Sequence, residues 1–309
     1  MGIGYYLSTY VLPAVLAFLM LGMGMTLTFK DFKNIILYPK SIAMALGLQM
    51  IILPGIAFTI AALAPISPSL KVGFILIAAC PGGTVSNLLS HLLRANLALS
   101  VSLTAVNSFL VVFSLPAIVN LGLLAFLGDT KSLDLPFWKT LLEILQITVI
   151  PCIVGILIRR YLPQLAKNLE KPLEYIMPVL LGITLAATVY FKESDPPINY
   201  LEHIFLLPYA LSLNLLGMII GYYSPKLLKI SRRNRLTMSL EVGLQNTGLA
   251  ITVATSANLL NDAEMAIPAV IYALFTFFTA TGWGVWINRS RKEKSSKKVS
   301  TNKEVASNS

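Results

Sequence analysis

Small and polar residues interrupt two long apolar segments, at Cys80-Pro81-Gly82-Gly83-Thr84-Val85-Ser86-Asn87 and at Glu241-Val242-Gly243-Leu244-Gln245-Asn246-Thr247-Gly248. Each run lies where a membrane-spanning helix is expected. Backbone that leaves the helix inside a bilayer has unpaired N–H and C=O groups, which persist only where protein, water or a bound solute satisfies them. One such break in each half of a chain indicates a transporter site.

The composition places the chain among polytopic membrane proteins. Hydrophobic residues make up 56% of the 309 residues, charged residues make up 12%, and the mean hydropathy is +0.74. These values are unlike those of a soluble domain. Segments of about 20 apolar residues, long enough to cross a bilayer, recur along the chain. We expect nine spans, at residues 5–27, 40–63, 70–94, 96–127, 138–158, 172–191, 202–223, 235–258 and 265–288.

The basic residues predict the orientation of these spans. With nine spans and a cytoplasmic C-terminus, 20 of the 24 Lys and Arg residues fall on the cytoplasmic side. This bias follows the positive-inside rule and predicts an N-terminus outside the cytoplasmic membrane. The first span lacks a basic leader and a cleavage site, so we expect a retained helix. The net charge of +10 is better explained by anionic lipid than by nucleic acid. Residues 289–309 are basic and polar, which predicts a disordered cytoplasmic tail.

The two breaks divide residues 1–288 into comparable blocks, at about 40–127 and 202–288. Each block holds a span, an interrupted span and a closing span. By the span count, the first interrupted span runs inward and the second runs outward. This predicts an inverted repeat in which two interrupted helices cross near the bilayer midplane.

Glu241 is exceptional among the 14 acidic residues, because the others fall in loops, in the tail or near span ends. A carboxylate at membrane depth is costly and is normally paired or solvated by a bound ion. No Lys or Arg lies near Glu241 within a span, so a metal cation or a proton is its expected partner. The surrounding residue types favour Na⁺, since hard cations prefer oxygen ligands. The oxygen donors of the two breaks are Gln245, Asn246, Thr247, Thr84, Ser86 and Asn87.

Further polar residues lie in neighbouring spans. Ser100 and Thr104 are four residues apart and share one helix face, where helix-packing hydroxyls are the alternative interpretation. Gln49 is placed to reach the crossing, whereas Asn214 has no assignable role. Ser86, His91 and Glu241 have the residue types of a hydrolytic triad, but the chain has no G-x-S-x-G turn. An enzyme is therefore not expected.

The motifs resemble those of the bile acid:sodium symporter family. The resemblance rests on Gly22-Met23-Gly24-Met25-Thr26-Leu27, on the Cys80–Asn87 run and on the Glu241–Gly248 run. The resemblance covers about residues 11 to 288. Within the family, the chain resembles a bacterial member in a nine-span form. It implies a core domain, at about 40–127 and 202–288, that contains the crossing helices. It also implies a panel domain, at about 5–27 and 138–191.

The resemblance further implies two Na⁺ sites. One would use Ser86, Asn87, Ser100, Thr104 and Glu241. The other would use Gln49, Glu241, Gln245 and the backbone carbonyls of Val242 and Leu244. Some bile-acid-binding relatives carry His-Asn in the last span, where this chain reads Thr276-Phe277.

We therefore expect a secondary active transporter that imports an organic anion with Na⁺ by alternating access. Bile-acid-like sterols and small carboxylates such as pantoate or pyruvate are the implied substrates. The expected substrate-binding residues are Thr84, Asn87, Asn246, Thr247 and Thr276. Four alternatives remain open: a proton-coupled carrier that uses Glu241, a passive channel, a receptor or membrane enzyme that does not transport, and arsenite efflux, a task of more distant relatives that would require Cys80.

Overall fold

A computed structural model describes residues 6–28, 36–128, 137–169, 200–256 and 259–307, together with positions 172, 176, 179, 180 and 183. The regular elements within these residues are helices. In chain order they are η1 (Leu7–Val11), α2 (Leu12–Thr26), α4 (Pro39–Gly47), η2 (Leu48–Ile52), α5 (Leu53–Leu63), α6 (Pro68–Ala78), α7 (Thr84–Leu92), α8 (Leu97–Phe126), α9 (Phe137–Ile144), η4 (Leu145–Val149), α10 (Ile150–Tyr161), η5 (Tyr200–Leu206), α12 (Leu207–Tyr223), η6 (Ser224–Lys226), α13 (Arg232–Gly243), α14 (Thr247–Thr255), η7 (Glu264–Ala266) and α15 (Ile267–Ser307).

Six helical stretches of the described chain are long and apolar enough to cross a membrane. They are Thr9–Thr26, Pro39–Leu63, Leu97–Phe126, Leu141–Tyr161, Glu202–Lys226 and Glu264–Arg289. These stretches coincide with six of the predicted spans and confirm a polytopic helical membrane protein. The predicted span at 172–191 lies mostly outside the described residues.

The two remaining predicted spans, 70–94 and 235–258, are each broken into a pair of shorter helices. Helix α6 ends at Ala78 and α7 begins at Thr84, while α13 ends at Gly243 and α14 begins at Thr247. Each break therefore overlaps one of the two polar runs of the sequence.

Side-chain caps fix where several of these helices begin. The Asn246 side chain accepts a hydrogen bond from the Leu249 backbone N–H at 3.0 Å and so caps α14. Asn96 caps α8 in the same way through the Leu99 N–H. Asn is a preferred N-cap residue because its side-chain oxygen satisfies an N–H that has no partner within the helix. Helix α7 begins after Gly83, which has no side chain to cap it.

The two broken helices meet at their breaks. Pro81 and Gln245 form an isolated antiparallel bridge. The Asn246 N–H donates to the Cys80 carbonyl at 3.0 Å. Gly82 lies against the other chain so closely that a Cβ atom there would be 2.5 Å from the Leu244 carbonyl oxygen. Each break thus satisfies part of the exposed backbone of the other, as a membrane interior requires.

Hydrogen bonds also join each broken helix to the segment that follows the other. In the first turn of α6, the Ser69 hydroxyl donates to Asp262 Oδ2 at 2.9 Å, and Asp262 follows α14. In the middle of α13, Thr237 Oγ1 accepts from the Asn96 N–H at 2.9 Å, and Asn96 follows α7. The first helix of each broken pair is therefore bound to the residues that follow the second helix of the other pair.

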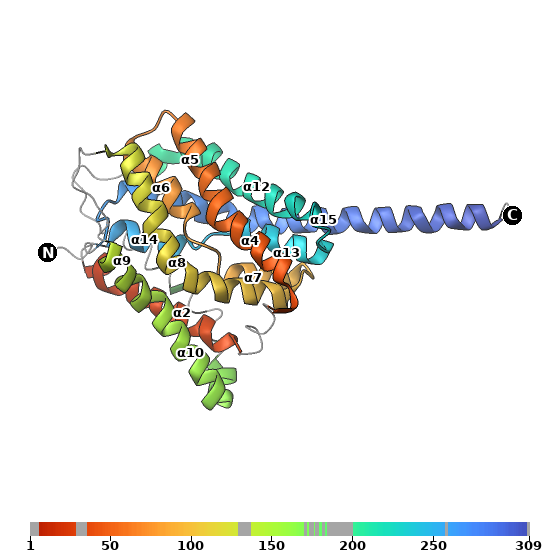
Figure 1. Cartoon of the computed structure of the whole chain (residues 1–309), viewed down its shortest axis with the longest axis horizontal. Coiled ribbons are helices and arrows are strands. Elements are labelled where there is room, and N and C mark those ends of the chain that lie inside the picture. Colours follow the sequence, from red (N-terminus) through yellow and green to blue (C-terminus); the bar gives the residue numbers. More distant parts are fainter. Residues whose placement is uncertain are drawn as a thin grey trace.

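Helix α2 packs mainly on α10, and the two lie side by side at one edge of the bundle (Figure 1). Gly24 and Gly155 allow this approach: a Cβ atom at Gly24 would be 2.2 Å from the Cys152 carbonyl oxygen, and one at Gly155 would be 2.3 Å from the Leu21 carbonyl oxygen. Small residues let membrane helices approach closely in this way. The pair lies within the segments expected to form the panel domain.

The C-terminal segment differs from our expectation of a disordered tail. Helix α15 continues to Ser307 and projects from the bundle as a single helix (Figure 1). Lys, Arg and Glu are good helix formers, and the segment extends a helix that is already formed in the membrane-spanning part. Extending an existing helix avoids the cost of nucleation, and the composition of residues 289–309 alone does not reflect this advantage.

Candidate ion site at the crossing of two broken helices

The candidate site is centred on Glu241, which lies two residues before α13 ends at Gly243. Its side chain is 1% exposed. No Lys or Arg side chain forms an ion pair with it within the described residues. A buried carboxylate without a compensating charge is unfavourable, so the groups around Glu241 determine what the site holds.

Hydroxyl and amide groups from two other helices surround this carboxylate. Thr104 Oγ1 on α8 lies 3.0 Å from Glu241 Oε1, and Ser100 Oγ lies 3.5 Å from Oε2. Thr104 Oγ1 is also 3.2 Å from Asn87 Oδ1 on α7. The Ser86 side chain interacts with the carboxylate and also donates to the Gly83 carbonyl. The residues of the first predicted Na⁺ site therefore lie together, drawn from α7, α8 and α13.

Asn107 is a residue of this cluster that sequence reasoning missed. It lies on α8, its side chain is 1% exposed, and it interacts with the Glu241 carboxylate. The signal was present in the sequence, because Asn107 is three residues after Thr104 and seven after Ser100. Residues at this spacing share one face of a helix.

A second polar group lies between the same broken helix and the α4–α5 span. Gln49 Nε2 donates to Gln245 Oε1 at 3.0 Å and to the Ala78 carbonyl at 3.3 Å. Gln245 Nε2 donates to the Val242 carbonyl at 2.7 Å. The structure thus brings together Gln49, Gln245 and Val242, which were predicted for the second Na⁺ site. The Leu244 carbonyl of that site lies against Gly82 at the crossing.

Asn214, to which no role could be assigned from the sequence, supports the end of α13. Asn214 Nδ2 and the Tyr272 hydroxyl each donate to the Gly243 carbonyl, at 2.7 Å in both cases. Asn214 Oδ1 in turn accepts from Thr279 Oγ1 at 2.8 Å. The last carbonyls of a helix have no partner within it. These side chains from α12 and α15 satisfy one of them beside Glu241.

The predicted substrate residues are less closely grouped. Asn246 and Thr247 are partly exposed at the start of α14, and Asn87 is partly exposed on α7. Thr84 begins α7, and its side chain lies outside what the structure describes. Thr276 is buried on α15 and, among the described residues, makes no side-chain hydrogen bond with either break. Among the described side chains of this set, Asn87 is the one that hydrogen-bonds with a residue of the Glu241 cluster, Thr104.

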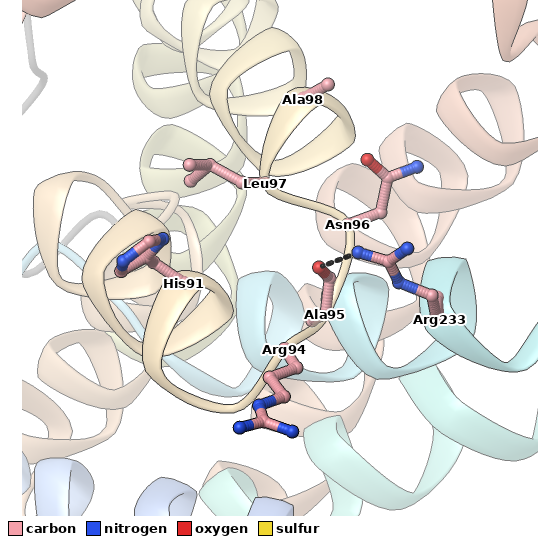
Figure 2. A pocket seen from close by; sticks show the side chains of 7 residues that line it. All are labelled: His91, Arg94, Ala95, Asn96, Leu97, Ala98 and Arg233. Carbon is pink, nitrogen blue, oxygen red and sulfur yellow. Dashed lines mark hydrogen bonds between the residues drawn. The ribbon is translucent and has the colours of Figure 1, made fainter.

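A pocket of about 630 Å³ lies elsewhere, around the connection between α7 and α8. Its lining residues are His91, Arg94, Ala95, Asn96, Leu97, Ala98 and Arg233. Figure 2 shows Arg233 reaching across to the Ala95 carbonyl, at 3.2 Å. None of the predicted ion or substrate residues lines this pocket. His91 belongs to it and not to the Glu241 cluster, so the residues of the hypothetical hydrolytic triad are not assembled.

These observations define a class of protein. Several membrane-spanning helices surround two broken helices that cross at their breaks, and a buried carboxylate lies beside the crossing. Secondary transporters are built in this way. The chain belongs to the Sodium Bile acid symporter family, whose profile matches residues 13–194. This confirms the resemblance inferred from the motifs. Family members are transporters and not enzymes, as predicted for this chain.

Individual relatives are sodium-dependent transporters by name. An uncharacterized sodium-dependent transporter of Bacillus subtilis, YocS, is 29% identical over 96% of this chain and 88% of its own length. The probable sodium/metabolite cotransporter BASS1 of Arabidopsis thaliana, a chloroplastic protein, is 28% identical over 89% of this chain and 66% of its own length. The hepatic sodium/bile acid cotransporter of Homo sapiens is 27% identical over 80% of this chain and 70% of its own length. The chain thus spans about two thirds of the Arabidopsis relative.

Proposed function

We propose that this protein imports an organic anion across the cytoplasmic membrane together with Na⁺, by alternating access. The observation that carries the proposal is the environment of Glu241. Its buried carboxylate is surrounded by oxygen-bearing side chains from α7 and α8 and has no cationic side chain beside it in the described residues. A bound Na⁺ would neutralise the carboxylate and use these oxygens as ligands.

Two Na⁺ ions fit the donor groups present. The first would be held by Glu241 with the Ser86, Asn87, Ser100 and Thr104 side chains. The second would be held by Glu241, by the Gln49 and Gln245 amide oxygens and by the Val242 and Leu244 carbonyls. All of these ligands are oxygens, which suits a hard cation. The first site would join both broken helices and α8, and the second would join one broken helix and the α4–α5 span. Ion binding would therefore favour one arrangement of these helices over others.

The substrate we propose carries a carboxylate. Helices α7 and α14 both begin at the breaks, and their first N–H groups and positive dipole ends favour a bound anion. Asn87, Asn246 and Thr247 lie at or near these helix starts and are proposed to orient it, with Thr84 and Thr276 as further contacts. Relatives are named for bile acid or for metabolites, which supports bile-acid-like sterols or small carboxylates such as pantoate or pyruvate as the class to test.

The experiment that tests the proposal is thermal unfolding of the purified protein in Na⁺ and in K⁺, for the wild type and for Glu241→Ala. A ligand that binds the folded state raises its stability in proportion to the logarithm of ligand concentration. We expect stabilisation by Na⁺ and not by K⁺, its loss in Glu241→Ala, and a further rise with the correct organic anion. The absence of any Na⁺ effect on the wild type would exclude the symporter.

Proton coupling is the second candidate, because protonation would also neutralise the buried Glu241 carboxylate. The two mechanisms differ in one measurement. In proteoliposomes, Na⁺-driven uptake requires a Na⁺ gradient at constant pH, whereas proton-driven uptake requires a pH gradient at constant Na⁺. Uptake that persists without Na⁺ and follows the pH gradient would assign the coupling to protons.

A further inference from the structure

Asn107 lies on the same face of α8 as two residues of the candidate ion site. Ser100, Thr104 and Asn107 are spaced by four and three residues, and all three side chains are buried, with exposed fractions of 0%, 0% and 1%. This spacing stacks them on one side of the helix, toward α13 and Glu241. Asn107 is therefore placed like the neighbouring ion-site residues.

The Asn107 amide is not satisfied by the protein around it. Its Oδ1 atom is buried and has no hydrogen-bond partner among the described residues. A buried polar atom without a partner is costly, and such atoms are rare in native structures. The same side chain hydrogen-bonds to Glu241, so an amide whose oxygen is unsatisfied lies beside a carboxylate that also lacks a compensating charge.

A single cation would satisfy both groups. The carboxylate supplies charge and oxygen ligands, and an amide oxygen is one of the neutral ligands that hard cations accept. The Thr104 hydroxyl is not the missing hydrogen-bond donor for Asn107 Oδ1, because it already lies within hydrogen-bonding distance of Glu241 and Asn87. What Asn107 lacks is a positively charged or donating partner, and a cation held by Glu241 would be that partner.

We propose that Asn107 is a ligand of the cation held at Glu241, through its side-chain oxygen. The inference rests on the proposed function, since it assigns one more ligand to the first Na⁺ site. It adds an oxygen from the second turn of α8 beyond Ser100, and so ties that helix more firmly to ion binding.

The test compares Asn107→Leu and Asn107→Asp with Ser108→Ala. Leu matches the size of Asn without an oxygen, whereas Asp keeps an oxygen and adds charge. Ser108 is the neighbouring residue, and its hydroxyl donates to the Thr104 carbonyl within the same helix, so it serves as the matched control. The measured quantities are the Na⁺ concentration that gives half of the thermal stabilisation and the unfolding temperature in Na⁺-free buffer.

We expect Asn107→Leu to raise the half-saturating Na⁺ concentration about tenfold, the effect of losing one good ligand. Asn107→Asp is expected to keep it unchanged or to lower it, and Ser108→Ala to leave it unchanged. If Asn107→Leu lowers the unfolding temperature without Na⁺ but leaves the half-saturating concentration as in the wild type, Asn107 is structural and the inference is wrong. If the Asn107→Leu variant does not fold, the half-saturating Na⁺ concentration is measured on Asn107→Ser instead.

The outcomes separate this inference from the function on which it rests. If the wild type does not respond to Na⁺, both the symport mechanism and the ligand role of Asn107 are overturned. If the wild type responds and Asn107→Leu responds equally well, the symport mechanism stands and the inference about Asn107 alone is overturned.

Discussion

Thr104 Oγ1 lies 3.0 Å from Glu241 Oε1, although 137 residues separate the two in the sequence. The contact joins the long helix α8 to the end of the first half of a broken helix, α13. It places a hydroxyl donor against a carboxylate that has no cationic partner in the described chain. This one distance links the two halves of the predicted repeat at the point where an ion is proposed to bind.

Replacing Thr104 by Val should weaken Na⁺ binding. Val keeps the branched shape but removes the hydroxyl, and hydrogen bonds to charged groups contribute about 1.5–3 kcal/mol. We expect a lower unfolding temperature without Na⁺ and a half-saturating Na⁺ concentration raised roughly tenfold or more. Thr148→Val is the control, because the buried Thr148 hydroxyl donates only to the Ile144 carbonyl of its own helix. Equal Na⁺ responses in the two variants would contradict the proposed role of Thr104.

Glu241→Gln should separate the stability of the fold from its response to Na⁺. The amide keeps the shape of the side chain but removes the uncompensated buried charge, which is costly in the ion-free protein. We expect an unfolding temperature in Na⁺-free buffer equal to or above that of the wild type, and no further rise when Na⁺ is added. A variant that is destabilised without Na⁺ and still responds to it would show that the ion binds elsewhere.

Gly82→Ala should disrupt the crossing of the two broken helices. The new Cβ atom would meet the Leu244 carbonyl oxygen at 2.5 Å, and that oxygen is backbone and cannot rotate away. Overpacking of this kind costs about 1–3 kcal/mol. Gly83→Ala is the matched control, because a Cβ atom there meets nothing within 4 Å. Thermal unfolding should show a loss for position 82 and little change at position 83, and similar losses at both would indicate backbone strain instead of a clash.

Asn214 and Tyr272 should act as a coupled pair. Both donate to the Gly243 carbonyl, so either one alone keeps that oxygen satisfied. We expect the double variant to lose more free energy of unfolding than the sum of the losses in the single variants Tyr272→Phe and Asn214→Leu. Leaving the buried carbonyl without a donor costs about 1–3 kcal/mol. A double-mutant cycle on the free energy of unfolding measures the coupling. Strictly additive effects would mean that the two side chains stabilise α13 independently.

The class of the protein and the positions of its breaks were readable from the sequence. Apolar segments of spanning length, with Gly-rich polar runs inside two of them, predict breaks in the same two places where the structure has them, between Ala78 and Thr84 and between Gly243 and Thr247. Glu241 was recognisable because no other acid lies so far inside a span. Local composition is sufficient for such features, since a bilayer penalises every exposed backbone and charged group.

The partners of these residues depend on packing between distant segments. Periodicity placed Ser100 and Thr104 on one face of a helix, and the same spacing includes Asn107, but only the folded structure shows that the Asn107 side chain interacts with Glu241. Asn214 had no role until α12 and α13 were seen to pack together, which brings its amide to the Gly243 carbonyl. The helical extension over residues 289–307 was not predicted, because the composition of that segment does not show that it continues a helix formed before it.

Hydropathy, charge bias and helix-breaking residues thus specified a broken-helix membrane transporter and its buried acid, because each acts through local chemistry that the bilayer selects. The approach of Pro81 to Gln245, the joining of α8 to Glu241 and the unsatisfied oxygen of Asn107 were specified by the folded arrangement. Their physical reason is the same in each case. A polar group buried away from water must find a partner in space, and which segment supplies it depends on how the helices pack.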